Sequence, residues 1–181
     1  MVTQLRSELG AEVDWRPFLL HPETPLDGEE FSTEKRQSLV PMINRVREMA
    51  QALGMPITFP DRMISTLRAL LATEHAREQG KLFEFHRAVF HRFFGLGQDI
   101  SRWDVLRAAA EDVGLNADLM QRLTESGAYN ATLEKWTIKA QDLGIEDVPT
   151  YVFNDNYAVV GVQPYEVFQL VLAQMEQDST S

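Results

Sequence analysis

The segment from Val148 to Phe168, VPTYVFNDNYAVVGVQPYEVF, restricts the fold of this chain more than any other stretch. Its apolar residues predict a short strand that opens on Val148-Pro149-Thr150 and a second strand at Tyr157–Val160. A tight turn near Asn154-Asp155-Asn156 joins them, and Pro164 begins a final helix, because proline is tolerated in a first helical turn. Proline lacks an N–H and has a fixed φ, so Pro149 at the head of a strand needs a reason. One such reason is a cis Val-Pro bond that holds the neighbouring backbone open for a ligand.

The composition of the 181 residues predicts one compact domain, with room for an inserted subdomain, and narrows its partners. A net charge of −10 argues against nucleic acids and anionic membranes, because both attract clustered lysine and arginine, and the 17 basic residues are scattered. No segment reaches the ~20 consecutive apolar residues that span a bilayer. The start, MVTQLRSELGAEV, lacks the apolar region of a signal peptide, so we expect a cytoplasmic protein.

The chain contains no cysteine, which excludes disulfides, thiolate metal sites and thiol catalysis within these residues. The spacing of the histidines does not indicate a metal site either. His86 and His91 are five residues apart, which does not align them on one helix face, and no His-Glu-x-x-His pattern surrounds His75. We therefore expect surface or half-buried positions for all four histidines, His21 included, with no metal site and no cofactor.

The first third of the chain mixes helical and extended patterns. Residues 2–9 predict a helix, and Glu12–Leu20 predicts a strand that lies at an edge or carries a bulge, because Pro17 cannot donate to a ladder. A further helix is expected between Thr33 and Leu53, with Pro41 kinking it or dividing it in two.

From Asp61 to Leu143 the pattern is helical almost throughout. Ser101 and Asn116 are expected to cap two of the helices, and Tyr129–Leu143 is expected to be the last helix of this block. Several aromatic residues are interpreted as core, namely Tyr151, Phe153, Phe168 and the helical stripe of Phe83, Phe90, Phe93 and Phe94. The alternative for the stripe is an apolar lid over a binding groove.

Four stretches resemble DsbA-like thioredoxin-fold proteins of the FrnE group: EVDWRPFLLHPETPLDG, AREQGKLFEFHRAVFHRFFGLGQDIS, DVLRAAAEDVGL and GIEDVPTYVFNDNYAVVGVQPYEVF. They follow in order along nearly the whole chain. The last is the most specific, since Val-Pro-Thr, the glycine and Gln-Pro stand at fixed offsets. The chain is also similar, more distantly, to 2-hydroxychromene-2-carboxylate isomerases and kappa-class glutathione transferases.

The resemblance implies an α/β fold, a thioredoxin-like sheet of the DsbA type with an inserted all-helical domain. Residues 1–59 and 145–181 would form the thioredoxin-like domain, and residues 60–144 the helical domain. Family members begin with a strand that ends in a Cys-x-x-Cys motif, whereas this chain begins inside what would be the following helix. The first strand is therefore expected to be missing. A truncated sequence, pairing of the flanking strands, or a strand borrowed from a second copy would each explain this.

The same resemblance places the substrate-binding site at Val148, Pro149 and Thr150. Pro149 is expected to be a cis proline whose loop faces the active centre, with Thr150 lining that loop. Val148 would offer its backbone N–H and C=O to an extended peptide or to a small thiol such as glutathione. The structural alternative is a trans proline in an edge strand. No catalytic residue is assigned.

The function implied by the resemblance is that of a thiol–disulfide oxidoreductase or isomerase, in which a cysteine thiolate attacks a substrate disulfide. Nothing in residues 1–181 can act as that thiolate, so we expect the chain to be redox-inactive. Two alternatives remain open. One is a redox-dead module that binds peptides or forms a homodimer, and the other is a relative of glutathione-dependent isomerases and transferases.

Overall fold

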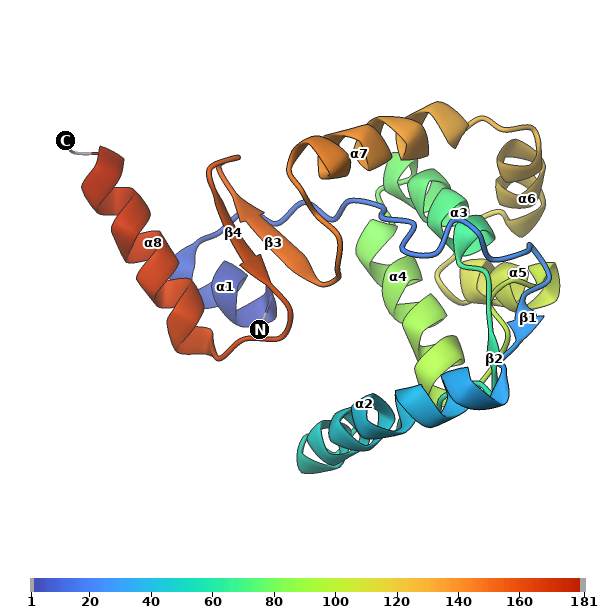
Figure 1. The fold of residues 1–181 in the computed structure, drawn as a ribbon. Coiled ribbons are helices and arrows are strands. Elements are labelled where there is room, and N and C mark those ends of the chain that lie inside the picture. Colours follow the sequence, from blue (N-terminus) through green and yellow to red (C-terminus); the bar gives the residue numbers. More distant parts are fainter. Residues whose placement is uncertain (1, 180–181) are drawn as a thin grey trace. The chain divides into compact units, whose positions relative to one another are not determined.

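The computed structural model describes residues 2–179, which divide into two compact units (Figure 1). One unit contains the residues up to Leu20 together with those from Trp136 onward, and the other contains His21–Lys135. The division falls inside helix α7. The domain boundaries expected at residues 59/60 and 144/145 stay a prediction, because compact units need not coincide with domains.

Helices dominate the described residues. They are α1 (Val2–Leu9), α2 (Thr33–Ala52), α3 (Leu67–Glu78), α4 (Leu82–Phe90), the π-helical turn η1 (His91–Gly95), α5 (Trp103–Asp112), α6 (Ala117–Glu125), α7 (Asn130–Asp142) and α8 (Tyr165–Ser179). The strands form two antiparallel pairs, β1 (Glu29–Glu30) with β2 (Arg62–Met63), and β3 (Thr150–Phe153) with β4 (Tyr157–Val160). Within residues 2–179 no helix has both the length and the apolar character needed to cross a membrane.

The hairpin of β3 and β4 is the sheet of the first unit. Its turn requires left-handed backbone at Asn154 and Asp155, with φ of 47° and 58°, a conformation that asparagine and aspartate tolerate. The register pairs Tyr151 with Val159, and the same face of the hairpin buries Phe168 of α8 completely. This hairpin, its turn and its core aromatics confirm the sequence prediction.

The predicted strand at Glu12–Leu20 is wrong, since these residues have no strand assignment. Pro17 lies inside the segment and cannot donate to a ladder. Side-chain contacts hold Arg16. The Arg16 guanidinium lies over the Trp136 ring, 3.8 Å from the ring centroid, and Arg16 also pairs with Asp14.

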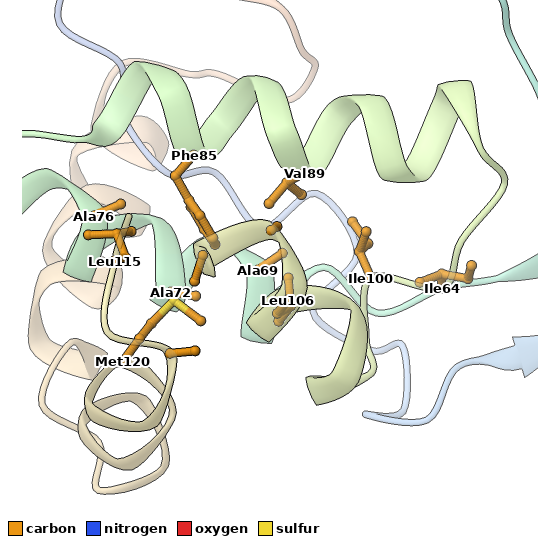
Figure 2. Packing of buried hydrophobic residues seen from close by; sticks show 13 residues of the cluster. Ile64, Ala69, Ala72, Ala76, Phe85, Val89, Ile100, Leu106, Leu115 and Met120 are labelled. Atoms are coloured by element: carbon orange, nitrogen blue, oxygen red, sulfur yellow. The ribbon is translucent and has the colours of Figure 1, made fainter. Parts of the chain in front are cut away.

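The core of the second unit lies among α3, α4, α5 and α6 (Figure 2). Phe85 of α4, Leu106 of α5 and Met120 of α6 are fully buried there. Alanines at Ala72 and Ala76 give α3 a flat face, which lets the larger side chains of the neighbouring helices approach closely. Helical patterning alone predicted this block correctly.

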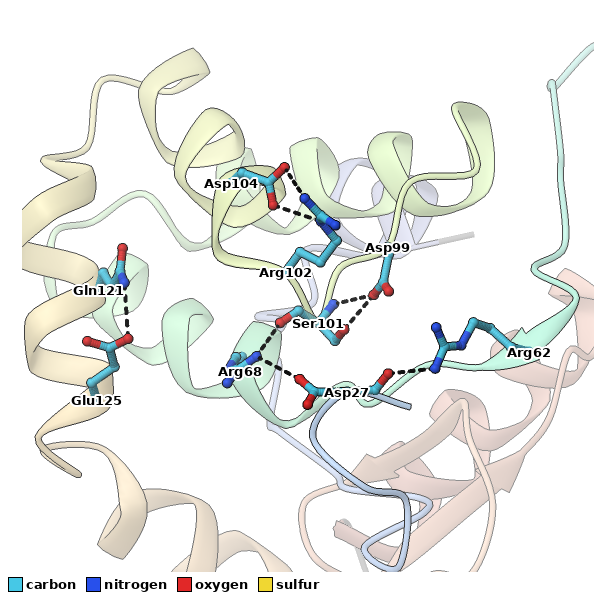
Figure 3. A network of polar contacts seen from close by, with 9 residues as sticks. All are labelled: Asp27, Arg62, Arg68, Asp99, Ser101, Arg102, Asp104, Gln121 and Glu125. Atoms are coloured by element: carbon cyan, nitrogen blue, oxygen red, sulfur yellow. Dashed lines mark hydrogen bonds and ion pairs between the residues drawn. The ribbon is translucent and has the colours of Figure 1, made fainter. Parts of the chain in front are cut away.

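A polar network fastens the loop after residue 20 to the helices of the same unit (Figure 3). Arg62 donates to the Asp27 carbonyl at 2.8 Å, and Arg68 donates to the Ser101 carbonyl at 2.8 Å. The Ser101 hydroxyl donates to Asp99 Oδ1 at 2.6 Å. The prediction that Ser101 caps α5 is wrong, because its side chain is engaged by Asp99 and Arg102 holds the cap position. Asn116, by contrast, caps α6 as predicted, accepting from the Leu119 N–H at 2.9 Å.

Helix α2 is continuous from Thr33 to Ala52, with Pro41 inside it. The alternative that Pro41 divides the helix is therefore wrong. Ser32 caps its start by accepting a hydrogen bond from the Lys35 N–H at 3.1 Å. An N-cap contributes about 1 kcal/mol, which offsets only part of the roughly 3 kcal/mol that an interior proline costs.

Candidate functional site

The candidate site is the loop that leads into β3. The Val148–Pro149 peptide bond is cis. The Pro149 carbonyl accepts a hydrogen bond from the Gly161 N–H at 2.7 Å, so the β3–β4 ladder continues one pair beyond the strands. The structure places Val148, Pro149 and Thr150 at the start of the hairpin, and their assignment as a binding site stays a prediction.

The ladder decides which way the backbone groups of this segment point. In an antiparallel pair, residues that exchange hydrogen bonds alternate with residues that do not. Because Pro149 faces Gly161 in a bonded pair, Tyr151 and Phe153 also direct their polar groups at β4. The polar groups of Thr150 and Val152 therefore point away from β4, toward the other edge of β3. Among residues 2–179 no hydrogen-bond partner meets the N–H or C=O of Thr150 or Val152 on that side.

Asp147 occupies part of the predicted site. Its Oδ1 accepts a hydrogen bond from the Val148 N–H at 2.8 Å, and its carbonyl accepts one from the Thr150 hydroxyl at 2.6 Å. The Val148 N–H, expected to receive a substrate, is thus already bonded to a neighbouring carboxylate. Sequence reasoning missed Asp147, although an aspartate directly before such a loop is a local signal, since its side chain readily bonds nearby backbone N–H groups.

The second face of the hairpin is apolar and exposed. Val148, Val152 and Val160 are 44%, 38% and 52% exposed. Thr150 stands opposite Val160 and Val152 opposite Ala158 on this face, across from the one that packs on Phe168. The loop therefore adjoins a strip of small apolar side chains and an unpaired strand edge.

Three members of the aromatic stripe line an open groove of about 650 Å³ in the second unit, namely Phe83, Phe90 and Phe94. Phe93 packs against the core, as predicted. The core prediction is wrong for Phe83 and Phe90, which are 37% and 50% exposed on the groove side. The π-helical turn His91–Gly95 follows Phe90 directly, so the spacing of an ordinary helix does not hold across this stripe.

His75 corrects the prediction for the histidines. His21 and His91 are exposed and His86 is half-buried, but His75 is only 1% exposed. Its Nδ1 lies 2.8 Å from the Tyr129 hydroxyl, which itself donates to Glu78 Oε2 at 3.1 Å. Burial lowers the pKa of His75, and burial together with the Glu78 carboxylate raises the pKa of Tyr129 to about 12. This arrangement ties α3 to the start of α7.

Within the described residues, no group of three or more histidine, aspartate and glutamate side chains could hold a metal ion. The loop at Val148 offers backbone donors and acceptors and no titratable nucleophile. Backbone groups at an unpaired strand edge are able to hydrogen-bond to an extended chain.

Comparison with known proteins identifies the family. The model of the DSBA-like thioredoxin domain matches residues 1–173. The protein YwbO of Bacillus subtilis (strain 168) is 27% identical over 166 residues, which are 90% of this chain and 81% of the relative. The 2-hydroxychromene-2-carboxylate isomerase of Sphingobium xenophagum is 28% identical over 155 residues, which are 83% of this chain and 78% of that enzyme.

A solved structure of a probable DsbA oxidoreductase from Streptomyces coelicolor shares the fold. It superimposes with a TM-score of 0.82 at 25% identity, over 96% of this chain and 80% of that one. The α/β fold of the DsbA type, expected from the sequence, is confirmed. With a family model covering nearly its whole length, this chain belongs to the DsbA-like thioredoxin-domain family.

Proposed function

We propose that this chain is a redox-inactive member of the DsbA-like family that binds extended peptides at the Val148-Pro149-Thr150 loop. One observation carries the proposal: the Thr150 N–H and C=O point away from β4 and have no partner among residues 2–179. Buried or bound backbone groups need hydrogen bonds, so this edge favours a ligand that supplies them in an extended conformation.

The absence of cysteine from the 181 residues supports the redox-inactive part of the proposal. Thiol–disulfide exchange proceeds by attack of a thiolate on a disulfide sulfur. The pure chain should therefore give no turnover in an insulin-reduction assay with dithiothreitol as reductant. A rate above the reductant-only background would contradict this expectation. The cytoplasmic location expected from the sequence stays a prediction.

The binding part is tested with a synthetic peptide of seven residues that alternates threonine and valine between two terminal lysines. Thr150→Pro removes the outward N–H of Thr150, whereas its matched control Thr150→Val keeps it. We expect Thr150→Pro to weaken binding about tenfold and Thr150→Val to change it by less than about twofold. Titration followed by amide chemical shifts measures both, and the Tyr151 amide reports whether the hairpin persists. Equal affinities for the two variants would refute the proposal.

A glutathione-dependent isomerase is the second candidate, because the relative from Sphingobium xenophagum is named as an isomerase. Glutathione carries a net negative charge at neutral pH, and the exposed Glu146 and Asp147 stand beside the loop. Their charge opposes an anionic ligand. Shifts of the Val148 and Thr150 amides with millimolar glutathione, but none with the peptide, would favour this second candidate over peptide binding.

A further inference from the structure

We propose that helix α2 and the groove beside it form a docking surface for an amphipathic helix of another protein, one whose polar flanks are acidic. This surface belongs to the second unit, whereas the Val148 loop belongs to the first, so the inference does not depend on the proposed function. It assigns to recognition an apolar face of α2 and the aromatic side chains of α4 that line the groove.

Apolar residues recur along α2 at alternating spacings of four and three, which is the heptad period of helices that pack lengthwise on other helices. These residues, the α2 stripe, are Leu39, Ile43, Val46, Ala50 and Leu53, and Met42 and Met49 border the stripe on one side. The stripe extends about 21 Å along the helix axis. That length suits a helix of several turns better than a small ligand.

The chain itself covers little of the α2 stripe. Within residues 2–179, α2 buries only one of its 20 residues, Ala50. Met42, Met49 and Leu53 are 47%, 40% and 71% exposed. Helices in proteins are stabilised mainly by the packing of an apolar face, and α2 also contains the destabilising Pro41. The uncovered face therefore favours a partner, and methionine adapts to the shape of such a partner.

Helix α4 supplies the second wall of the docking surface. Its Phe83, Arg87 and Phe90 follow one another at spacings of four and three, and all three line the open groove of about 650 Å³. Ala50 of the α2 stripe lines the same groove, so the stripe and the groove are continuous. An amphipathic helix that lies along α2 covers both, because its apolar face enters the groove while its flanks stay in water.

Charge selects a partner with acidic flanks. Lys35 and Arg45 lie at helical spacings beside the α2 stripe, and neither makes an ion pair among residues 2–179. On α4, the basic Arg87 is exposed, and Glu84 opposes it in part. Helix α2 carries four basic and two acidic side chains, although the net charge of the chain is −10. Charges farther than about 10 Å are screened at 0.1 M salt, so the nearby basic residues dominate.

A second copy of the chain is the poorer occupant. Two α2 helices packed stripe to stripe bring two basic helices together, and like charges in contact destabilise such a pair. Docking of α2 on a different surface of the copy is head-to-tail, and it leads to rings or filaments instead of a closed dimer. The charges therefore favour a different protein that supplies the acidic helix.

A synthetic peptide of three heptads tests the inference. It has leucine at positions a and d, glutamate at e and g, which keeps it from pairing with itself, and alanine elsewhere. Amide chemical shifts of the full chain should change mainly in α2 and α4 as this peptide is added. A matched peptide with lysine in place of every glutamate should bind at least about tenfold more weakly. Equal or tighter binding of the lysine peptide would overturn the acidic assignment.

Met42→Gln locates the binding surface, with Val40→Gln as the matched control. Val40 is 49% exposed and lies on the side of α2 away from Met42. We expect Met42→Gln to weaken the glutamate peptide about tenfold and Val40→Gln to change its affinity less than about twofold. Equal effects of the two variants, or no binding to the parent chain, would overturn the inference. Shifts in α2 that depend on protein concentration without peptide would identify a second copy as the occupant, against the inference.

Discussion

The Tyr129 hydroxyl is the partner on which the buried His75 depends. Because this hydroxyl donates its only proton to Glu78, His75 Nδ1 must carry the hydrogen and act as donor. Tyr129→Phe leaves that N–H buried without an acceptor, so we expect the free energy of unfolding to fall by about 1–3 kcal/mol. Urea denaturation measures the loss. Tyr157→Phe is the control, since its hydroxyl bonds the exposed Asp178 and should cost less than about 1 kcal/mol.

Burial also makes His75 a source of pH dependence. Its pKa is lowered from the ordinary 6.5, with desolvation as the cause and the Glu78 charge opposing it. The unfolded chain therefore binds a proton at a higher pH than the folded one. The stability from neutral His75 is complete above about pH 6.5 and declines as the pH falls through the lowered pKa. Urea midpoints at a series of pH values should show this decline.

His75→Asn is the matched variant for this pH dependence, because its amide N–H stands in for the Nδ1 donor and does not titrate. The decline of stability below pH 6.5 should be shallower in this variant than in the parent chain. Burial lowers the pKa of His86 as well, and that contribution is common to both proteins and cancels in the comparison. Identical pH profiles would show that His75 contributes nothing to the decline.

At the scale of the element, Pro41 destabilises α2, and a substitution at this position should stabilise the helix. Pro41 has no N–H for the Gln37 carbonyl one turn earlier, and proline inside a helix costs about 3 kcal/mol. Pro41→Ala should therefore increase the protection of the α2 amides against hydrogen exchange by about 1–3 kcal/mol. Ser38→Ala, in the same helix, is the control and should gain less than about 1 kcal/mol. A gain from Pro41→Ala no larger than the control would contradict this account.

Elements were predictable where their signals are local. The hairpin of β3 and β4 followed from alternating apolar residues and an Asn-Asp-Asn turn, and the helical block followed from its period and from caps such as Asn116. The segment Glu12–Leu20 was predicted wrongly, because strand formation depends on a neighbouring strand that the sequence does not display. The contact of His75 with Tyr129 was not predicted either, because 54 residues separate the two in the sequence. Within the candidate site, the hydrogen bonds of Asp147 to Val148 and Thr150 were missed, although the position of an aspartate directly before the loop is visible in the sequence.

At the scale of the whole molecule, the charge of −10 should set how the chain responds to salt. Attraction between exposed charges is screened beyond about 10 Å at 0.1 M salt. If acidic residues near β3 recruit a basic peptide, its affinity should fall several-fold between about 0.02 M and about 0.3 M sodium chloride. A matched peptide with glutamates in place of the two terminal lysines is repelled by the same charges and should bind slightly better at the higher salt.

Glu146→Gln combined with Asp147→Asn locates the source of this salt dependence. If the two carboxylates beside the loop act directly, the double variant should lose most of the salt dependence while apolar contacts with Val148 and Val152 persist. If the overall charge of the molecule acts at longer range, the double variant should keep most of it, because eight of the ten net negative charges remain. Isothermal titration at the two salt concentrations distinguishes a local acidic site from a general electrostatic attraction.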